Sequence, residues 1–179
     1  MKYPQGLALF VCIRRQLLFV LALWFLDVAP AMAQQQDTVP PEAAESDSTA
    51  IMAAIEVFFD GLAAKDSTAM LSVVDRDMRV VLTSSMANGD PLMRSIPIED
   101  FTTFIVGQQD TAMLETYWDP SIRVHDNLAT VWISYNFYFN DTLDHCGEDT
   151  FQFFRSLDGW KIIALADTQR REGCDADAD

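Results

Sequence analysis

The segment HCGEDTFQFFRSLDGWKIIALADTQRREGC, residues 145–174, decides the fold at the carboxyl end of the chain. Two runs rich in aromatic and β-branched residues stand on either side of Asp158 and Gly159. An Asp-Gly pair favours the primed turns that close two-residue β-hairpins. The segment therefore predicts a hairpin with strands at residues 148–155 and 160–168.

The register of this hairpin follows from its turn. If Asp158 and Gly159 are the two turn residues, Thr150 lies opposite Asp167. Because side chains alternate between the faces of a strand, Asp167 then shares a face with Leu165. A carboxylate beside apolar side chains loses solvation, which raises its pKa and suits it to act as a base near neutral pH. Asp167 is therefore a candidate catalytic residue.

Upstream of the hairpin, helical patterns come first and strand patterns follow. Apolar residues recur at helical spacing in residues 50–65, 67–74 and 97–107, and strand patterns occupy residues 78–86, 113–124 and 128–139. Asn88 and Gly89 supply a turn, and Pro120 is expected at a bulge or a sheet edge. Three helices followed by a mostly antiparallel sheet indicate an α+β domain with its helices on one face.

The strand at residues 128–139 has two different faces. One is wholly apolar or aromatic, with Val131, Ile133, Tyr135, Phe137 and Phe139, and the other mixes rings with hydrogen-bonding groups. We expect ligand binding by Tyr135, Phe137 and Trp118. We expect a homodimer through the mixed face, whose members are Trp132, Ser134, Asn136 and Tyr138. An antiparallel sheet can bury one side on its own core and leave the other for a partner.

The first 33 residues have the order of a secretory signal peptide. Basic residues precede an apolar run at residues 17–26, and small residues follow it up to Ala33. We expect cleavage after Ala33 and a periplasmic or secreted protein. The alternative is a retained membrane anchor, for which the ten apolar residues are too few unless residues 7–13 extend the run.

The remaining chain divides by composition. Residues 34–49 hold two prolines and few apolar side chains, which predicts a disordered linker in which Asp47 is solvated or, with Ser48, caps the first helix. Residues 50–174 are the expected folded domain, and residues 175–179 are an acidic tail.

The chain is strongly acidic, with a formal net charge of −15. Without residues 1–33 it keeps 9 Lys and Arg against 26 Asp and Glu. Such a surface repels phosphate backbones and anionic lipid, so we expect no nucleic-acid partner and, after signal cleavage, no membrane partner. The sequence has no glycine-rich phosphate loop and no Gly-x-Ser-x-Gly elbow, and no cofactor is predicted.

The order of elements resembles the nuclear transport factor 2-like superfamily, in particular its secreted bacterial members of unassigned activity (SnoaL-like or lumazine-binding type). The resemblance covers roughly residues 51–174, and its most specific parts are ATVW, HCG, DGWKI and DT. It implies a cone-shaped, curved antiparallel sheet wrapped around three N-terminal helices, with a pocket between them and frequent dimers through the outer sheet face. Members include isomerases, dehydratases, cyclases, hydrolases and non-catalytic binding domains, so the fold does not fix the function.

Cys146 and Cys174 are the only cysteines after residue 33, and an exported chain lies in an oxidising compartment. In a straight strand the predicted register would place them about 10 Å apart, but Gly173 can bend the chain back. We predict a Cys146–Cys174 disulfide that clamps the last strand. A zinc site is the disfavoured alternative, because His145 and Cys146 are adjacent and face opposite ways.

The two candidate catalytic residues also have structural interpretations. Asp167 can pair with Arg170 or Arg171, or accept a hydrogen bond from Thr150 across the hairpin. His145 is either a strand-start residue whose ring bonds nearby backbone, or an acid or base at the pocket mouth.

Three functions remain open. The first is an exported, non-catalytic domain that binds a mainly apolar small molecule, favoured by the aromatic sheet and by the lack of a second ionisable group placed opposite Asp167. The second is a small isomerase or dehydratase that uses Asp167 or His145, with Tyr135 or Tyr138 as hydrogen-bond donor. The third is a dimeric protein-interaction module.

Overall fold

The computed structural model describes residues 41–175, which belong to one compact unit of the chain. The predicted signal peptide, residues 34–40 of the linker and residues 176–179 of the acidic tail lie outside the described residues. No helix between residues 41 and 175 has the length and apolar character that crossing a membrane requires.

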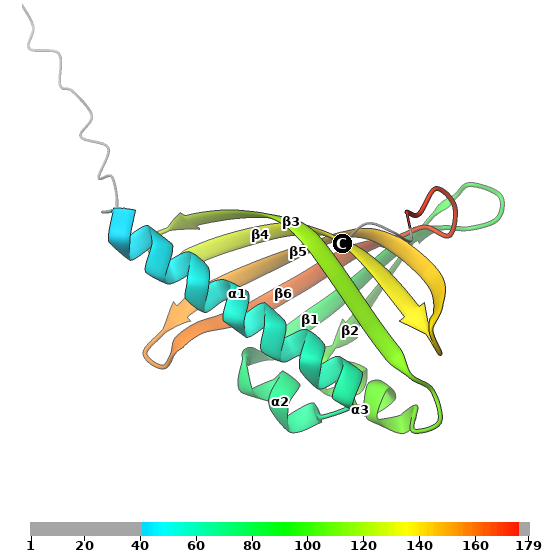
Figure 1. Ribbon diagram of the computed structural model, residues 1–179, viewed down its shortest axis with the longest axis horizontal. Helices are drawn as coiled ribbons and strands as arrows, with labels where there is room; N and C mark the ends of the chain where they lie inside the picture. The colour runs from blue at the N-terminus through cyan, green and yellow to red at the C-terminus, as the bar shows by residue number, and fades with distance from the viewer. Residues whose placement is uncertain (1–40, 176–179) are drawn as a thin grey trace, which may run out of the picture. The chain divides into compact units, whose positions relative to one another are not determined.

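Helices α1 (Pro41–Ala64), α2 (Ser67–Ser72) and α3 (Ile98–Gly107) pack on one six-stranded sheet (Figure 1). The strands are β1 (Val74–Ser85), β2 (Pro91–Pro97), β3 (Met113–His125), β4 (Leu128–Phe139), β5 (Thr142–Ser156) and β6 (Gly159–Gln169), in the order β2-β1-β6-β5-β4-β3. Figure 1 shows α1 lying across the concave face of the curved sheet. The α+β prediction is confirmed, but β1 and β6 run parallel, so the sheet is mixed rather than wholly antiparallel.

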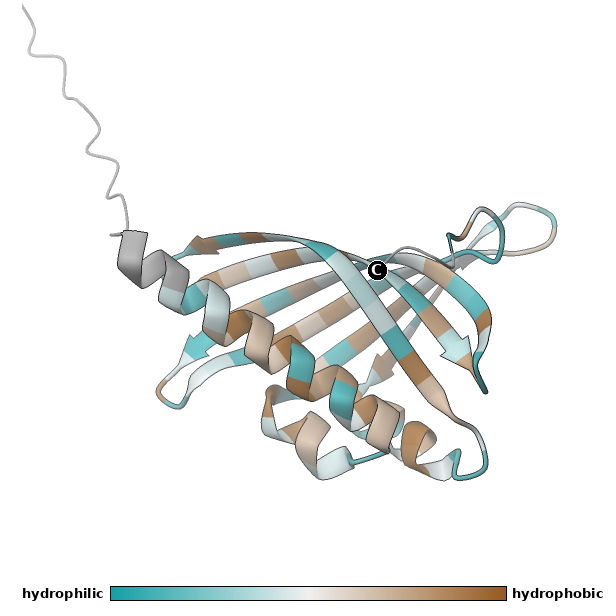
Figure 2. Ribbon diagram, viewed as in Figure 1, coloured by the Kyte–Doolittle hydropathy of each residue, from teal (hydrophilic) through white to brown (hydrophobic). Residues whose placement is uncertain are grey.

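Helix α1 forms because its apolar residues recur every three or four positions. Ile51, Ile55, Phe58 and Leu62 are all buried, and Figure 2 shows this apolar stripe alternating with polar positions along the helix. The helix begins at Pro41, so residues 41–49, predicted as a disordered linker, are helical.

Asp47 explains why the helix extends so far. Its side chain forms an ion pair with Arg155 of β5 and accepts a hydrogen bond from Trp160 Nε1 of β6 at 3.3 Å. The hydrogen bond from Arg155 holds the pKa of Asp47 below its usual range, against the effect of burial. Asp47 is therefore neither solvated nor a helix cap, and it fastens the first turns of α1 to the last hairpin.

Strand β2 was not predicted, because its residues are almost all exposed and show no alternating apolar pattern. The predicted turn at Asn88 and Gly89 precedes it, and Gly89 has the positive φ of +86° that such a turn needs. Pro91 and Pro97 begin and end the strand, which suits an edge position.

The predicted register of the last hairpin is wrong. The two turn residues are Leu157 and Asp158, and Gly159, with φ of +103°, pairs with Ser156 instead of lying in the turn. A register shift between Gln152 and Phe153 then reduces the error from two residues near the turn to one residue beyond it. The residue opposite Asp167 is consequently Asp149 rather than Thr150. Two carboxyl groups are thereby brought onto one face of neighbouring strands.

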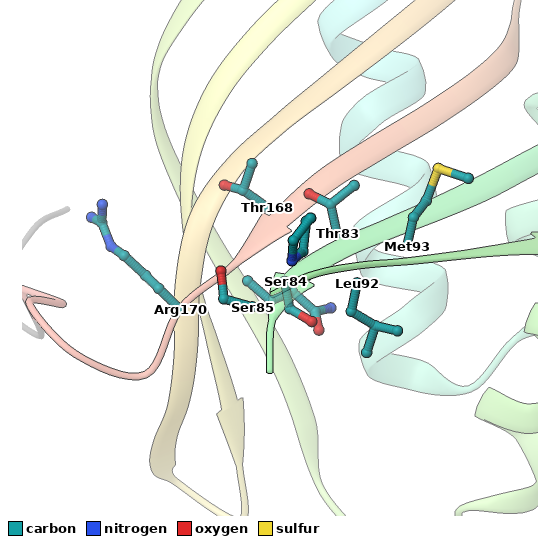
Figure 3. Close-up of a pocket in the computed structure, with 9 residues that line it drawn as sticks. Thr83, Ser84, Ser85, Leu92, Met93, Thr168 and Arg170 are labelled. Carbon is teal, nitrogen blue, oxygen red and sulfur yellow. The ribbon is translucent and has the colours of Figure 1, made fainter. Parts of the chain in front are cut away.

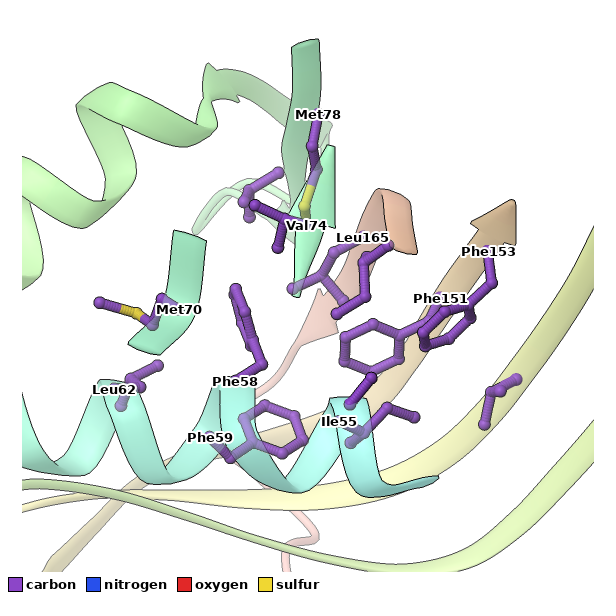
Figure 4. Close-up of a cluster of buried hydrophobic side chains, with 14 of the residues drawn as sticks. Ile55, Phe58, Phe59, Leu62, Met70, Val74, Met78, Phe151, Phe153 and Leu165 are labelled. Atoms are coloured by element: carbon purple, nitrogen blue, oxygen red, sulfur yellow. The ribbon is translucent and has the colours of Figure 1, made fainter. Parts of the chain in front are cut away.

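The core lies between α1 and the concave face of the sheet. The ring of Phe58 lies 6.3 Å from Phe101 of α3 and 6.4 Å from Phe151 of β5, measured between centroids. Figure 4 shows Phe58 and Ile55 of α1 directed toward Phe151 and Phe153 of the sheet. Aromatic packing of this kind fixes how α1 lies on the sheet, and hence the walls of any pocket beside it.

Replacing Asp47 by Ala should lower the free energy of unfolding by about 2 kcal/mol, because the Arg155 guanidinium and the Trp160 N–H lose their hydrogen-bond acceptor. Urea denaturation measures this change. Asp60→Ala, at an exposed position of the same helix, is the matched control and should change stability far less. Equal effects of the two substitutions would contradict the fastening role of Asp47.

Candidate functional site

A pocket of about 370 Å³ opens between α1, α3 and the concave face of the sheet. Its walls are aromatic, and six of the lining side chains are phenylalanines: Phe58, Phe59, Phe101, Phe104, Phe137 and Phe139. Burial distinguishes its two ends. Phe58 and Asp149 are almost inaccessible and mark the floor, whereas Phe104 is 57% exposed and marks the mouth together with Arg171.

Three carboxyl groups gather in this pocket from three strands. Asp149 of β5 and Asp167 of β6 lie opposite each other, and Glu115 of β3 forms a side-chain hydrogen bond with Asp149. Asp149 Oδ2 is buried and has no conventional donor as partner. The described residues contain no group of His, Cys, Asp and Glu side chains that could hold a metal ion.

Lost solvation controls the protonation of this cluster. Burial raises the pKa of Glu115 to about 8, opposed by its hydrogen bond with Asp149 and reinforced by the charge of Asp167. Burial, followed by the charge of Glu115, also raises the pKa of Asp149. A hydrogen bond between two carboxyl groups needs a proton on at least one of them, so the pair can both donate and accept a hydrogen bond.

Asp167 is held by three donors. They are Thr83 N at 3.1 Å, Gln169 Nε2 at 2.8 Å and the Tyr135 hydroxyl at 3.4 Å. Burial raises the pKa of Asp167, and these hydrogen bonds oppose the rise without cancelling it. Asp167 is thus bonded neither by Thr150 nor by Arg170 or Arg171, the partners that its structural interpretation assumed.

The hydroxyl of Tyr135 reaches the floor because β5 has no side chain in its way. Tyr135 of β4 lies opposite Gly147 of β5, and its hydroxyl also donates to the Thr168 carbonyl of β6 at 3.0 Å. A Cβ at Gly147 would lie 1.7 Å from that carbonyl oxygen. Burial, then the neighbouring carboxylates, raise the pKa of Tyr135, so it remains a protonated donor.

His145 joins the same pocket beside Asp144. The His145 ring stacks on Phe137 with centroids 4.9 Å apart, and its Nδ1 lies 2.8 Å from Asp144 Oδ2. Burial raises the pKa of Asp144, but the bond to His145 and the charge of Arg171 outweigh it and bring the pKa below its usual range. Since an ionised carboxylate only accepts hydrogen bonds, His145 Nδ1 is the donor of this bond. The partner of His145 is a carboxylate rather than the predicted backbone.

Two residues predicted for the pocket lie elsewhere. Trp118 is opposite Ser134, on the convex face of the sheet, because Glu115 and Tyr117 occupy the inward positions of β3. Tyr138, opposite Leu114, is on that outer face too and cannot be the pocket donor. Of the predicted ligand-binding residues, Phe137 lines the pocket, and Tyr135 reaches it through its bond to Asp167.

The predicted dimer face is partly covered by the chain itself. Trp132 is 55% exposed, but Asn136 is fully buried and its Nδ2 donates to the Asp175 carbonyl at 2.7 Å. The Cys146–Cys174 disulfide, present with a Cα–Cα distance of 5.7 Å, holds this C-terminal segment in place. Asn136 is therefore not available to a partner, and dimerisation through the rest of the face stays a prediction.

Sequence reasoning missed Glu115 and Asp149, although a signal existed. Glu115 stands between Met113 and Tyr117 in strand alternation, and Asp149 precedes Phe151 in the same way. Each is an acidic residue at a position whose strand neighbours on the same face belong to the core. Only the correct register shows that the two side chains contact each other.

A wider, more open hollow of about 590 Å³ lies over β1, β2 and β6 (Figure 3). Two of its hydroxyls already serve the fold: Thr83 Oγ1 donates to the Asp167 carbonyl at 2.6 Å, and Thr168 Oγ1 accepts from Glu148 N at 3.0 Å. The convergent ionisable groups lie in the aromatic pocket instead, so that pocket is the candidate site.

The raised pKa of Glu115 predicts a pH-dependent stability. Between about pH 5 and about pH 8 the folded state binds more protons than the unfolded state, so the free energy of unfolding falls as pH rises, by up to about 1.4 kcal/mol per pH unit for each proton. Glu115→Gln should flatten this slope, whereas Glu56→Gln, on the exposed side of α1, should keep it. Urea denaturation across this range measures the slope, and a stability that is constant or rises with pH would contradict the account.

Comparisons with known proteins place the fold. No family model and no curated protein matches the chain. A nuclear transport factor 2-like protein from Cytophaga hutchinsonii superposes with a TM-score of 0.56 at 14% identity, covering 69% of this chain and 98% of that one. A proposed dehydratase of the same family from Streptomyces avermitilis gives 0.53 at 15% identity, covering 71% and 98%. A proposed aromatic ring hydroxylase from Novosphingobium aromaticivorans gives 0.55 at 15% identity, covering 74% and 92%. The chain therefore has the nuclear transport factor 2-like fold, as the resemblance of its sequence implied.

Proposed function

We propose that this protein binds a mainly apolar small molecule in the aromatic pocket, with a polar group of the ligand at the carboxyl cluster. The observation that carries the proposal is a pocket lined by six phenylalanines whose buried floor holds Asp149 and Asp167. Aromatic walls supply affinity for an apolar body, and a few convergent polar groups fix its orientation. The shared fold is compatible with this proposal, because the proteins that superpose on this chain include a proposed dehydratase and a proposed aromatic ring hydroxylase.

Naphthol is a suitable test ligand, since it joins an apolar bicyclic body to one hydroxyl. Calorimetric titration should show binding, and Phe104→Asp should weaken it at least about tenfold by placing a charge at the apolar mouth. Phe154→Asp is the matched control, because Phe154 is 47% exposed and pairs with Leu128 away from the pocket. Absence of naphthol binding, or equal losses in both variants, would overturn the proposal.

A second candidate function is proton transfer, as in an isomerase or dehydratase. It is favoured by two observations: Asp149 lies opposite Asp167, and the Asp144–His145 pair lines the same pocket. Sequence reasoning had placed no second ionisable group near Asp167. In this scheme ionised Asp167 takes a proton from the carbon beside a ligand carbonyl, and the protonated Glu115–Asp149 pair donates a hydrogen bond to the enolate oxygen.

Solvent deuterium exchange at the carbon beside the carbonyl of tetralone, followed by proton NMR, tests this second function. The wild-type protein should accelerate the exchange over buffer at the same pH, and Asp167→Asn should remove about a hundredfold or more of the acceleration. Asp126→Asn, in an exposed turn, should retain the wild-type rate. Exchange no faster than buffer would leave the pocket with a binding role alone.

A further inference from the structure

We propose that the ligand of this pocket is a carboxylic acid: its apolar body lies between the phenylalanine walls, its carboxylate meets Arg94 at the mouth, and a hydroxyl or carbonyl at its far end reaches Asp149. This inference rests on the proposed function and names the class of small molecule. A rigid aromatic or alicyclic acid with a second polar group at the opposite end fits the description.

Arg94 lines the pocket without an acidic partner. Arg94 of β2 pairs with Leu82 of β1, and Leu82 lines the pocket as well. Although the chain has 27 acidic against 12 basic residues, no ion pair or hydrogen bond engages Arg94 within residues 41–175. Asp100 lines the adjoining groove with Arg94 but does not pair with it. A guanidinium of this kind offers several donors in a planar fork that matches a carboxylate.

One acid that lines the pocket, Asp144, is already paired with cationic or hydrogen-bonding partners. Asp144 lines the pocket near Arg171, whose Nη2 lies 3.2 Å from Asp144 Oδ2. His145 Nδ1 lies 2.8 Å from the same oxygen. Asp144 is therefore already paired with these two donors, whereas no ion pair engages the positive charge of Arg94 within residues 41–175.

The floor of the pocket, unlike the mouth, disfavours a ligand carboxylate. Asp149 is 2% exposed, its Oδ2 lacks a conventional donor, and Glu115 and Asp167 stand beside it. A second carboxylate entering this end would be repelled, whereas a hydroxyl could donate to Asp149 and a carbonyl could accept the proton that Asp149 shares with Glu115. The two ends thus fix the direction in which the ligand enters: neutral polar end first, carboxylate last.

Four probes separate these contributions: naphthol, naphthoic acid, hydroxynaphthoic acid with its two groups at opposite ends of the rings, and the methyl ester of that acid. In calorimetric titrations the wild-type protein should bind hydroxynaphthoic acid about tenfold more tightly than its ester. It should also bind hydroxynaphthoic acid more tightly than naphthoic acid, which lacks the group for the floor. Arg94→Gln should abolish the preference for the acid over the ester while leaving naphthol affinity within about twofold.

The matched control is Arg123→Gln. Arg123 pairs with Thr130, is exposed and has no described partner either, but it does not line the pocket. Its substitution should preserve the preference for the acid. An equal affinity of the wild-type protein for acid and ester, or an unchanged preference in Arg94→Gln, would overturn the carboxylate assignment while naphthol binding still supports the pocket. If no probe binds, including naphthol, the proposed function fails as well.

Discussion

Gly147 lets Tyr135 reach across β5, and the polar floor of the pocket depends on that crossing. Any side chain at Gly147 would collide with the Thr168 carbonyl, the same group that accepts the Tyr135 hydroxyl at 3.0 Å. The hydroxyl also lies 3.4 Å from Asp167 Oδ2, so the crossing links three strands at the point where the carboxyls meet. Strand alternation around the glycine then directs His145 into the pocket and Cys146 outward into the disulfide. In the HCG motif, His145 therefore lines the pocket, Cys146 forms the disulfide and Gly147 leaves room for the Tyr135 side chain.

A carboxyl cluster inside an aromatic pocket is unfavourable for the fold by itself. Its cost is reduced because Glu115 and Asp149 hold a proton between them and because Asp167 receives hydrogen bonds from Thr83 and Gln169. Asp149 Oδ2 has no conventional donor, and Asp149 lines a pocket that a ligand can fill. Buried polar groups that lack partners within the protein are commonly satisfied by what binds there, and this supports a ligand rather than a purely structural role.

Local patterns in the sequence predicted the fold, and long-range geometry limited the prediction of the site. Alternation identified the inward face of β4, and helical spacing identified the buried stripe of α1, because both depend only on neighbours in sequence. The hairpin register failed because Gly159 lies just after the turn, and one such displacement changes every cross-strand partner. No local pattern in the sequence indicates that β1 pairs in parallel with β6. None indicates that Arg94, on an exposed edge strand, lies beside the pocket. Asp167 could therefore be named from the sequence, whereas Asp149, Glu115 and Arg94 could not.

Carbon NMR titration of the side-chain carboxyls of Glu115, Asp149 and Asp167 in the ligand-free protein tests whether the floor of the pocket is desolvated. The account predicts that all three change protonation above the usual carboxyl range, with Glu115 near pH 8 and with coupled shifts in Glu115 and Asp149 that reveal the shared proton. If all three carboxyls are fully ionised at about pH 5 and titrate independently, the floor is solvated and the account of the pocket is wrong.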